Sequence, residues 1–137
     1  MTDRPFTERT DAVIAAAEPL DIQQVVANAR DHYRDRYDAI RQHHLHGESG
    51  ANVVRALSDL ADDILTGLFN AAQHGLASRF RSSGRIALCA LGGYGRRELS
   101  PQSDLDVCLV YEGRFDKRVR ALNELFVTCL WDIGFRS

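Results

Sequence analysis

Residues 91–110 read LGGYGRRELSPQSDLDVCLV and join two apolar segments, 86–91 and 105–111. Each apolar segment has the length of a buried strand, and the glycine and proline residues between them indicate turns. Gly92 and Gly93 have no Cβ atom, so their backbone N–H groups can approach an anionic ligand closely. This stretch therefore predicts a strand, an anion-binding turn and a second strand.

Two acids, Asp104 and Asp106, stand at the start of the second expected strand, and Asp106 interrupts its apolar run. Side chains two residues apart on a strand point to the same face, so both carboxylates are expected to project together. Neighbouring carboxylates repel each other unless a cation lies between them, and oxygen ligands suit Mg²⁺. The pair predicts a magnesium site.

A glycine turn or an acid pair alone usually marks only a turn or a solvated strand end, but together they describe a nucleotide site. In such a site two metal ions hold the triphosphate during displacement at phosphorus. Two alternatives remain open. Arg96 and Arg97 either neutralise phosphate charge or face solvent, paired with Glu98. Tyr94 either stacks on a base or packs under the turn.

Amphipathic patterns predict helices on both sides of this stretch. The clearest runs from about 52 to 79, with apolar residues at the i, i+3, i+4 and i+7 positions. A more polar helix is expected from Asp21 toward Gly47, and another over 116–133, with Trp131 packed in the core. The expected division of the chain is a loose leader over 1–20, a helical extension over 21–82 and a strand-containing unit over 83–137.

Composition places the chain among soluble globular proteins. It has 137 residues, of which 45% are hydrophobic and 26% charged. Its 17 basic and 19 acidic residues give a net charge of 17 − 19 = −2. That balance disfavours binding to nucleic acid, and no apolar stretch approaches the ~18 to 20 residues of a membrane span. Cys89, Cys108 and Cys129 stand in apolar surroundings without metal-type spacing, which predicts buried free thiols in a reducing cytoplasm.

Two strands make a marginal sheet, which normally needs a third strand or a helical cover. The sequence also stops directly after the last expected helix. We therefore expect the chain to be a fragment of a longer protein.

The motif at 91–93 and 104–106 resembles the signature of the polymerase-β-like nucleotidyltransferases. That signature is a hydrophobic residue followed by Gly and Gly or Ser, and then, after a gap of about ten residues, Asp, a hydrophobic residue, and Asp or Glu. The longer string GGYGRRELSPQSDLD, at 92–106, is most similar to the N-terminal domain of the bacterial PII uridylyltransferases. WDIGF, at 131–135, resembles the same enzymes.

The resemblance implies an α/β (α+β) domain with the polymerase-β-like nucleotidyltransferase fold, incomplete and preceded by a helical extension. It also implies catalytic, metal-binding acids and a turn that holds the β- and γ-phosphates. We also expect Ser103, beside the acids, and the basic side chain of Arg96, just after the turn, to contact phosphate. The expected site residues are Asp104 and Asp106 for catalysis and metal, and Gly92, Gly93, Ser103 and Arg96 for the nucleotide.

The implied reaction transfers UMP from UTP to a tyrosine hydroxyl of the PII signal protein, with Mg²⁺ as cofactor. A second reading is an adenylyltransferase that uses ATP, because the motif does not select the base. A third is a non-catalytic nucleotide-binding or protein-interaction module. The family takes a third metal-binding carboxylate from a later strand, and no acid after Asp106 lies in a recognisable strand here. We therefore expect the third ligand to be absent from this chain.

Overall fold

The computed structural model describes residues 4–16, 19–80 and 84–136. Five helices and two strands make up most of this part of the chain. In chain order they are α1 (Phe6–Ala15), α2 (Ile22–Leu45), α3 (Gly50–Ala77), β1 (Ile86–Ala90), α4 (Gly92–Gly95), β2 (Val107–Tyr111) and α5 (Lys117–Ile133).

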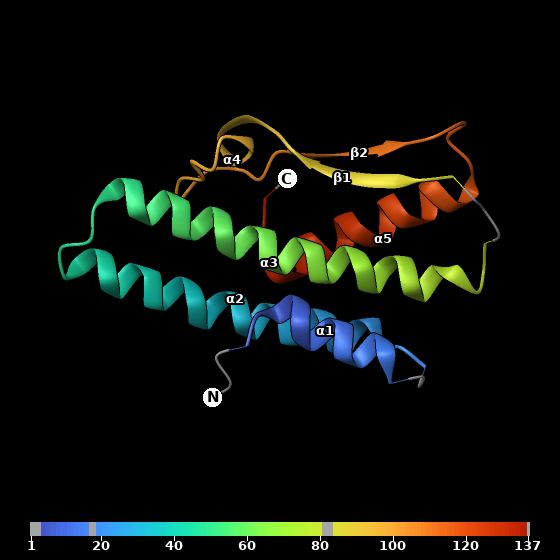
Figure 1. Ribbon diagram of the computed structural model, residues 1–137, viewed down its shortest axis with the longest axis horizontal. Helices are drawn as coiled ribbons and strands as arrows, with labels where there is room; N and C mark the ends of the chain where they lie inside the picture. Colours follow the sequence, from blue (N-terminus) through green and yellow to red (C-terminus); the bar gives the residue numbers. More distant parts are fainter. Residues whose placement is uncertain (1–3, 17–18, 81–83, 137) are drawn as a thin grey trace.

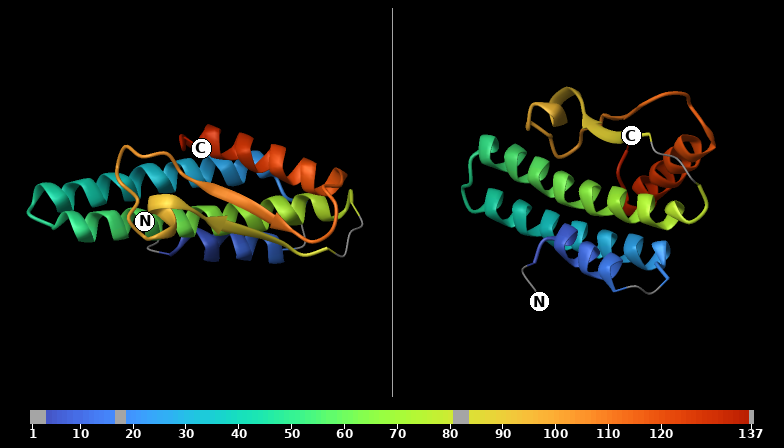
Figure 2. Two further views of the ribbon diagram at one scale, coloured as in Figure 1. Left: turned by 90° about the horizontal axis from the view of Figure 1, so that it is seen from above. Right: turned by 45° about the vertical axis from the view of Figure 1, so that its right-hand side comes forward.

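Helix α3 lies at the centre of the molecule and packs against α1, α2 and α5. The two strands lie across one side of α3 and α5, whereas α1 and α2 lie on the other side of α3 (Figure 1). Figure 2 shows the same layers from above and from an oblique angle. The fold is therefore a helical body that carries a small sheet, consistent with part of a nucleotidyltransferase fold.

The main helices begin and end where their capping residues place them. Asp21 accepts hydrogen bonds from the backbone N–H groups of Gln23 and Gln24, and so begins α2. Asp116 accepts from the backbone N–H of Val119 at 2.9 Å and begins α5. Gly134, with φ +111°, ends α5 in the left-handed conformation that glycine favours. The expected helices are confirmed within a few residues at each end.

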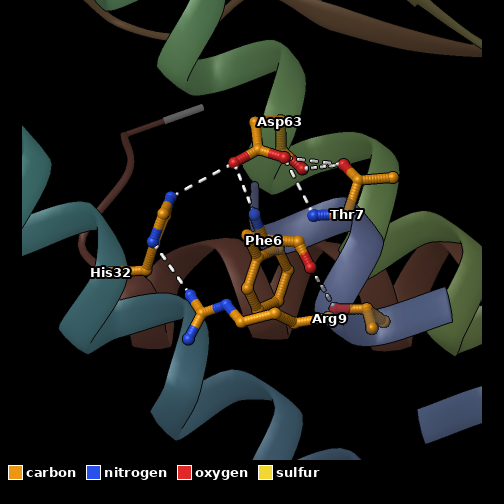
Figure 3. A network of polar contacts seen from close by, with 6 residues as sticks. Phe6, Thr7, Arg9, His32 and Asp63 are labelled. Carbon is orange, nitrogen blue, oxygen red and sulfur yellow. Dashed lines mark hydrogen bonds and ion pairs between the residues drawn. The ribbon is translucent and has the colours of Figure 1, made fainter. Parts of the chain in front are cut away.

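The loose leader expected over 1–20 is wrong for residues 6–15, which form α1. The residue before this helix, Pro5, offers no side-chain cap. Asp63 of α3 supplies one instead, because its carboxylate accepts from the backbone N–H groups of Phe6 at 2.7 Å and Thr7 at 2.8 Å (Figure 3). Phe6 is 2% exposed, so the helix is also held by its packing.

Strands β1 and β2 pair antiparallel, with Ile86 opposite Tyr111 and Ala90 opposite Val107. Alternate strand residues, among them Ile86 and Val107, pack against the helical core, as in a sheet covered on one face. The opposite face is more open, and Val110 is 52% exposed there.

The second strand begins two residues later than expected, so Asp106 precedes the strand instead of lying within it. The strand begins at Val107, and Asp106 is exposed at the end of the preceding loop. Leu105 is the buried residue of this loop, at 2% exposure. The apolar residues 105 and 107–111 therefore belong to two different structures. Leu105 packs in the core from the loop, and the strand begins only after Asp106.

Two further expectations about burial need correction. Trp131 is 63% exposed, because it lies on the outer side of α5 while Leu130 and Ile133 fill the core. Of the three free cysteines only Cys129 is buried, and Cys89 and Cys108 are half-buried at directly opposed positions of the sheet. In the described part of the chain, no helix is long and apolar enough to cross a membrane.

Candidate functional site

The glycine turn is a single helical turn, α4, at the end of β1. The backbone N–H of Leu91 donates to the carbonyl of Asp106 at 2.8 Å and extends the pairing of the two strands by one step. The chain then turns at Gly92, whose φ of +57° lies in the left-handed region. The strand pairing therefore brings the start of the turn directly beside the second acid of the motif.

The close approach of the turn to its neighbours explains why its residues are glycines. A Cβ atom on Gly92 would lie 2.8 Å from Oδ2 of Asp106, and one on Gly95 would lie 2.8 Å from the carbonyl oxygen of Ala90. Both distances are shorter than ordinary Cβ contacts, so a neighbour would have to shift. At Gly95 that neighbour is backbone, whereas at Gly92 it is the end of the exposed Asp106 side chain, which would have to turn aside. Gly92 is thus the residue that lets the turn pack against the carboxylate of Asp106.

The two acids of the motif lie on either side of a buried residue. Asp104 and Asp106 are exposed, and Leu105 between them is 2% exposed. The backbone N–H of Leu105 donates to the carbonyl of Arg136 at 2.6 Å, which fixes this loop to the end of the chain after α5. Because the extended chain alternates in this way, both carboxylates face solvent on the side away from the core.

The chemistry of these donors suits a hard divalent cation. Carboxylate oxygens are preferred ligands of Mg²⁺, and the missing Cβ of Gly92 leaves room beside Asp106. Within residues 4–16, 19–80 and 84–136, no group of three or more His, Cys, Asp or Glu side chains gathers as a metal site. The arrangement therefore offers two exposed carboxylates that could hold a cation, and no third His, Cys, Asp or Glu side chain gathers with them in that part of the chain.

The other two expected site residues lie close to the turn and the acids. Ser103 is exposed, and its hydroxyl donates to the carbonyl of Ser100 at 3.0 Å. The Arg96 Nε donates to Glu98 Oε2 at 3.3 Å, and both side chains are mostly exposed. A surface pair of this kind contributes little free energy and can rearrange for a charged ligand.

Side chains within and just after the turn contact α3, a relationship that the sequence left open. Tyr94 packs under the turn at 6% exposure, and its hydroxyl donates to Asp62 Oδ1 at 2.6 Å. The Arg97 guanidinium forms ion pairs with Asp59 and Asp62. A signal for these partners exists in the sequence, because polar residues 58, 59 and 62 lie within about one turn of each other on one face of the helix.

Gly92, Asp104 and Asp106 are exposed. A cavity of about 760 Å³ lies elsewhere, between the N-terminal part of the chain, α2 and α3, and it is lined by His32, Asp63 and their neighbours. None of Gly92, Asp104 or Asp106 lines that cavity.

Residues 34–137 match the family described as "Putative nucleotidyltransferase DUF294". The chain belongs to this nucleotidyltransferase family. The match contains both the glycine turn and the paired acids, so the family and the geometry point to the same segment.

Several curated relatives of this DUF294 chain carry the name bifunctional uridylyltransferase/uridylyl-removing enzyme. The protein from Streptomyces coelicolor is 48% identical over 86 residues, which is 63% of this chain and 10% of that protein. The protein from Caulobacter vibrioides is 34% identical over 92 residues, or 66% of this chain and 10% of that protein. The protein from Acinetobacter baumannii is 33% identical over 88 residues, or 64% of this chain and 9% of that protein.

The matched segments thus span about a tenth of the length of these curated relatives. No solved structure matches the chain significantly.

Proposed function

We propose that this chain carries the nucleotide- and metal-binding half of a uridylyltransferase site, which transfers UMP from UTP to a tyrosine hydroxyl of a PII-type signal protein. The observation that carries the proposal is the packing of the Gly92 turn against the carboxylate of Asp106. The packing supports the proposal because a metal-bound triphosphate needs backbone N–H groups for its phosphates close to a carboxylate for its metal ion.

In this proposal the residues of the chain bind and orient the nucleotide. The backbone N–H groups at Gly92 and Gly93 approach the β- and γ-phosphates, because no Cβ atom blocks them. Ser103 offers a hydroxyl beside the acids, and Arg96 a guanidinium that can exchange Glu98 for a phosphate oxygen.

Asp104 and Asp106 would hold Mg²⁺, which supplies charge neutralisation at the phosphates when bound. In the transfer itself the tyrosine oxygen bonds to the α-phosphorus, the bond to the β-phosphate oxygen breaks, and pyrophosphate leaves. The tyrosine proton passes to solvent. We propose that the 137-residue chain binds the nucleotide without completing turnover, since the family's third carboxylate does not join this pair in the described residues.

The names of the relatives support uridine over adenine as the base. The glycine turn and the acids contact phosphate and metal and carry no information about the base, so ATP is the competing nucleotide. Titration of the chain with UTP and with ATP, each with Mg²⁺, separates the two: the proposal requires tighter binding of UTP.

Calorimetric titration with UTP and Mg²⁺ tests the site through Asp104→Asn and Asp106→Asn. Each change removes one carboxylate charge from an exposed position, so the fold is expected to persist. Affinity should fall by at least about tenfold in each variant, which corresponds to about 1.4 kcal/mol. Asp11→Asn is the matched control, because Asp11 is exposed on α1, on the far side of α3 from the sheet (Figure 1).

The metal assignment is wrong if the Asp106→Asn chain binds the metal–nucleotide as tightly as the unmodified chain. Equal binding with and without Mg²⁺ would contradict it as well.

A further inference from the structure

The glycine turn has little conformational preference of its own. Three of the four residues of α4 are glycines, and glycine loses more backbone entropy on ordering than any other residue. We propose that Asp62 of α3 is a positioning residue for the nucleotide site, which holds the turn in place through Tyr94. This inference rests on the proposed function and extends the site into the helical part of the chain.

The first connection joins Tyr94 to Asp62. The tyrosine ring is buried at 6% exposure, and its hydroxyl donates to Asp62 Oδ1 at 2.6 Å. Burial, with the hydrogen bond and the charge of Asp62, raises the pKa of Tyr94 above its ordinary value. The hydroxyl therefore remains a donor, and a hydrogen bond to a charged acceptor is stronger than a neutral one.

A second connection lies five residues further along the chain. The Ser58 hydroxyl donates to the carbonyl of Val54 at 2.8 Å and accepts from the backbone N–H of Leu99 at 3.1 Å. Ser58 is fully buried and Leu99 is 8% exposed. The bond satisfies a buried backbone donor, which ties the end of the turn segment to α3.

A third connection holds a strained residue. Arg97 has a φ of +60°, a left-handed conformation that residues other than glycine rarely adopt. Its guanidinium pairs with Asp59 and Asp62, and its backbone N–H donates to the carbonyl of Tyr94 at 2.9 Å. Each ion pair is exposed and weak by itself, and both join this residue to α3.

The three connections are made by residues 94, 97 and 99, which lie within or just after the glycine turn and precede the acids of the motif. Figure 1 shows α4 above the first half of α3, the part that supplies all three partners. The approach of Gly92 to Asp106 depends on where the turn lies, so loosening the turn should weaken nucleotide binding without removing any group that touches the nucleotide.

The experiment compares Tyr94→Phe with Tyr111→Phe in the full 137-residue chain. Tyr94→Phe keeps the buried ring and removes only the hydroxyl bonded to Asp62. Tyr111→Phe removes a hydroxyl at the far end of β2 and serves as the control. The two readouts are amide hydrogen exchange of residues 92–99 and the dissociation constant for UTP with Mg²⁺.

Tyr94→Phe is expected to speed exchange in 92–99 and to weaken nucleotide binding by roughly fivefold or more, as the loss of one charge-assisted hydrogen bond implies. Asp62→Ala also removes the ion pair with Arg97 and should weaken binding at least as much. Adding Tyr94→Phe to Asp62→Ala should then change little further, because the bond between these two side chains is already lost. Asp62→Asn keeps an oxygen acceptor for the tyrosine and should retain most of the affinity.

Unchanged exchange in the Tyr94→Phe chain would overturn the inference, and so would faster exchange with unchanged affinity. If the changes in binding free energy caused by Tyr94→Phe and Asp62→Ala add fully in the double variant, the two side chains are not coupled. If the unmodified chain does not bind UTP with Mg²⁺, the proposed function itself is wrong and the positioning role is lost with it. The two failures are therefore distinguished by the behaviour of the unmodified chain.

Discussion

Gly92 and Asp106 lie so close together that a methyl group on the glycine would come within 2.8 Å of the acid's Oδ2 atom. The two residues are fourteen positions apart, and the hydrogen bond from Leu91 N–H to the Asp106 carbonyl fixes their relative placement. The turn and the acid therefore behave as one structural unit, in which a change at the glycine alters the position of the carboxylate.

Gly92→Ala is expected to weaken binding of UTP with Mg²⁺ by at least about tenfold. The added methyl group must displace Asp106, and alanine must also adopt a φ of +57°. Gly113→Ala separates these effects, because Gly113 has a φ of +82° and nothing within 4 Å of an added Cβ. That control should lose stability through backbone strain and retain the affinity of the unmodified chain. Equal affinity loss in both variants would show that steric contact with Asp106 is unimportant.

The parts of the fold that depend on local pattern could be predicted from the sequence. The period of α3, the cap at Asp21 and the stop at Gly134 are each specified by residues within one or two helical turns. The glycine turn and the acids were recognisable for the same reason. Their mutual contact follows from antiparallel pairing of the strands, which the sequence left undefined.

The features that sequence reasoning missed depend on distant contacts. Helix α1 is short, and its cap comes from Asp63, 56 or 57 residues away from the N–H groups that it accepts from. The anchoring of Tyr94 on α3 is similarly non-local, with a separation of 32 residues. Trp131 shows another limit, since periodicity does not tell which residues at the edge of an apolar face stay in contact with solvent.

Asp63→Ala should destabilise the chain by about 2 kcal/mol, the upper range for loss of a helix cap. The change leaves the backbone N–H groups of Phe6 and Thr7 without their acceptor. Asp63→Asn should cost less, since an asparagine oxygen also caps helices well. Urea unfolding measures both, with Asp11→Ala on the exposed side of α1 as the control. The cap assignment fails if Asp63→Ala and Asp11→Ala unfold at the same urea concentration.

The three cysteines should differ in their reactivity toward an alkylating reagent. Burial, with a smaller effect from the charge of Asp132, raises the pKa of Cys129 to about 11, and its side chain is 3% exposed. At pH 8 the reactive thiolate of Cys129 is therefore scarce and shielded. Cys89 and Cys108 are half-buried and should be alkylated first. Mass spectrometry of partly labelled protein checks the order, and early labelling of Cys129 would contradict its burial in the core.

Acidification should weaken the attachment of α1 before it protonates most carboxylates. Arginine only donates and a carboxylate only accepts, so His32 accepts from Arg9 Nη2 at Nδ1, 2.9 Å away, and donates from Nε2 to Asp63 at 3.1 Å. Both contacts are drawn in Figure 3, and a ring that accepts at one nitrogen and donates at the other is the neutral imidazole. Burial is the main reason that the pKa of His32 lies below its ordinary value of 6.5, and Asp63 opposes the shift.

The lowered pKa of His32 determines how the stability of the fold changes with pH. Because the unfolded chain takes up the His32 proton more readily than the folded one, stability is lost as the pH falls below about 6.5 toward the folded pKa. Burial alone would raise the pKa of Asp63, but the N–H groups of Thr7 and Phe6 bring it below 3.8, so its contribution is lost only in stronger acid. His32→Gln should therefore flatten the fall in melting temperature between pH 7.5 and pH 5.5, whereas His74→Gln, at an exposed position of α3, should leave it unchanged. An identical fall in the His32→Gln chain would assign the pH dependence to other groups.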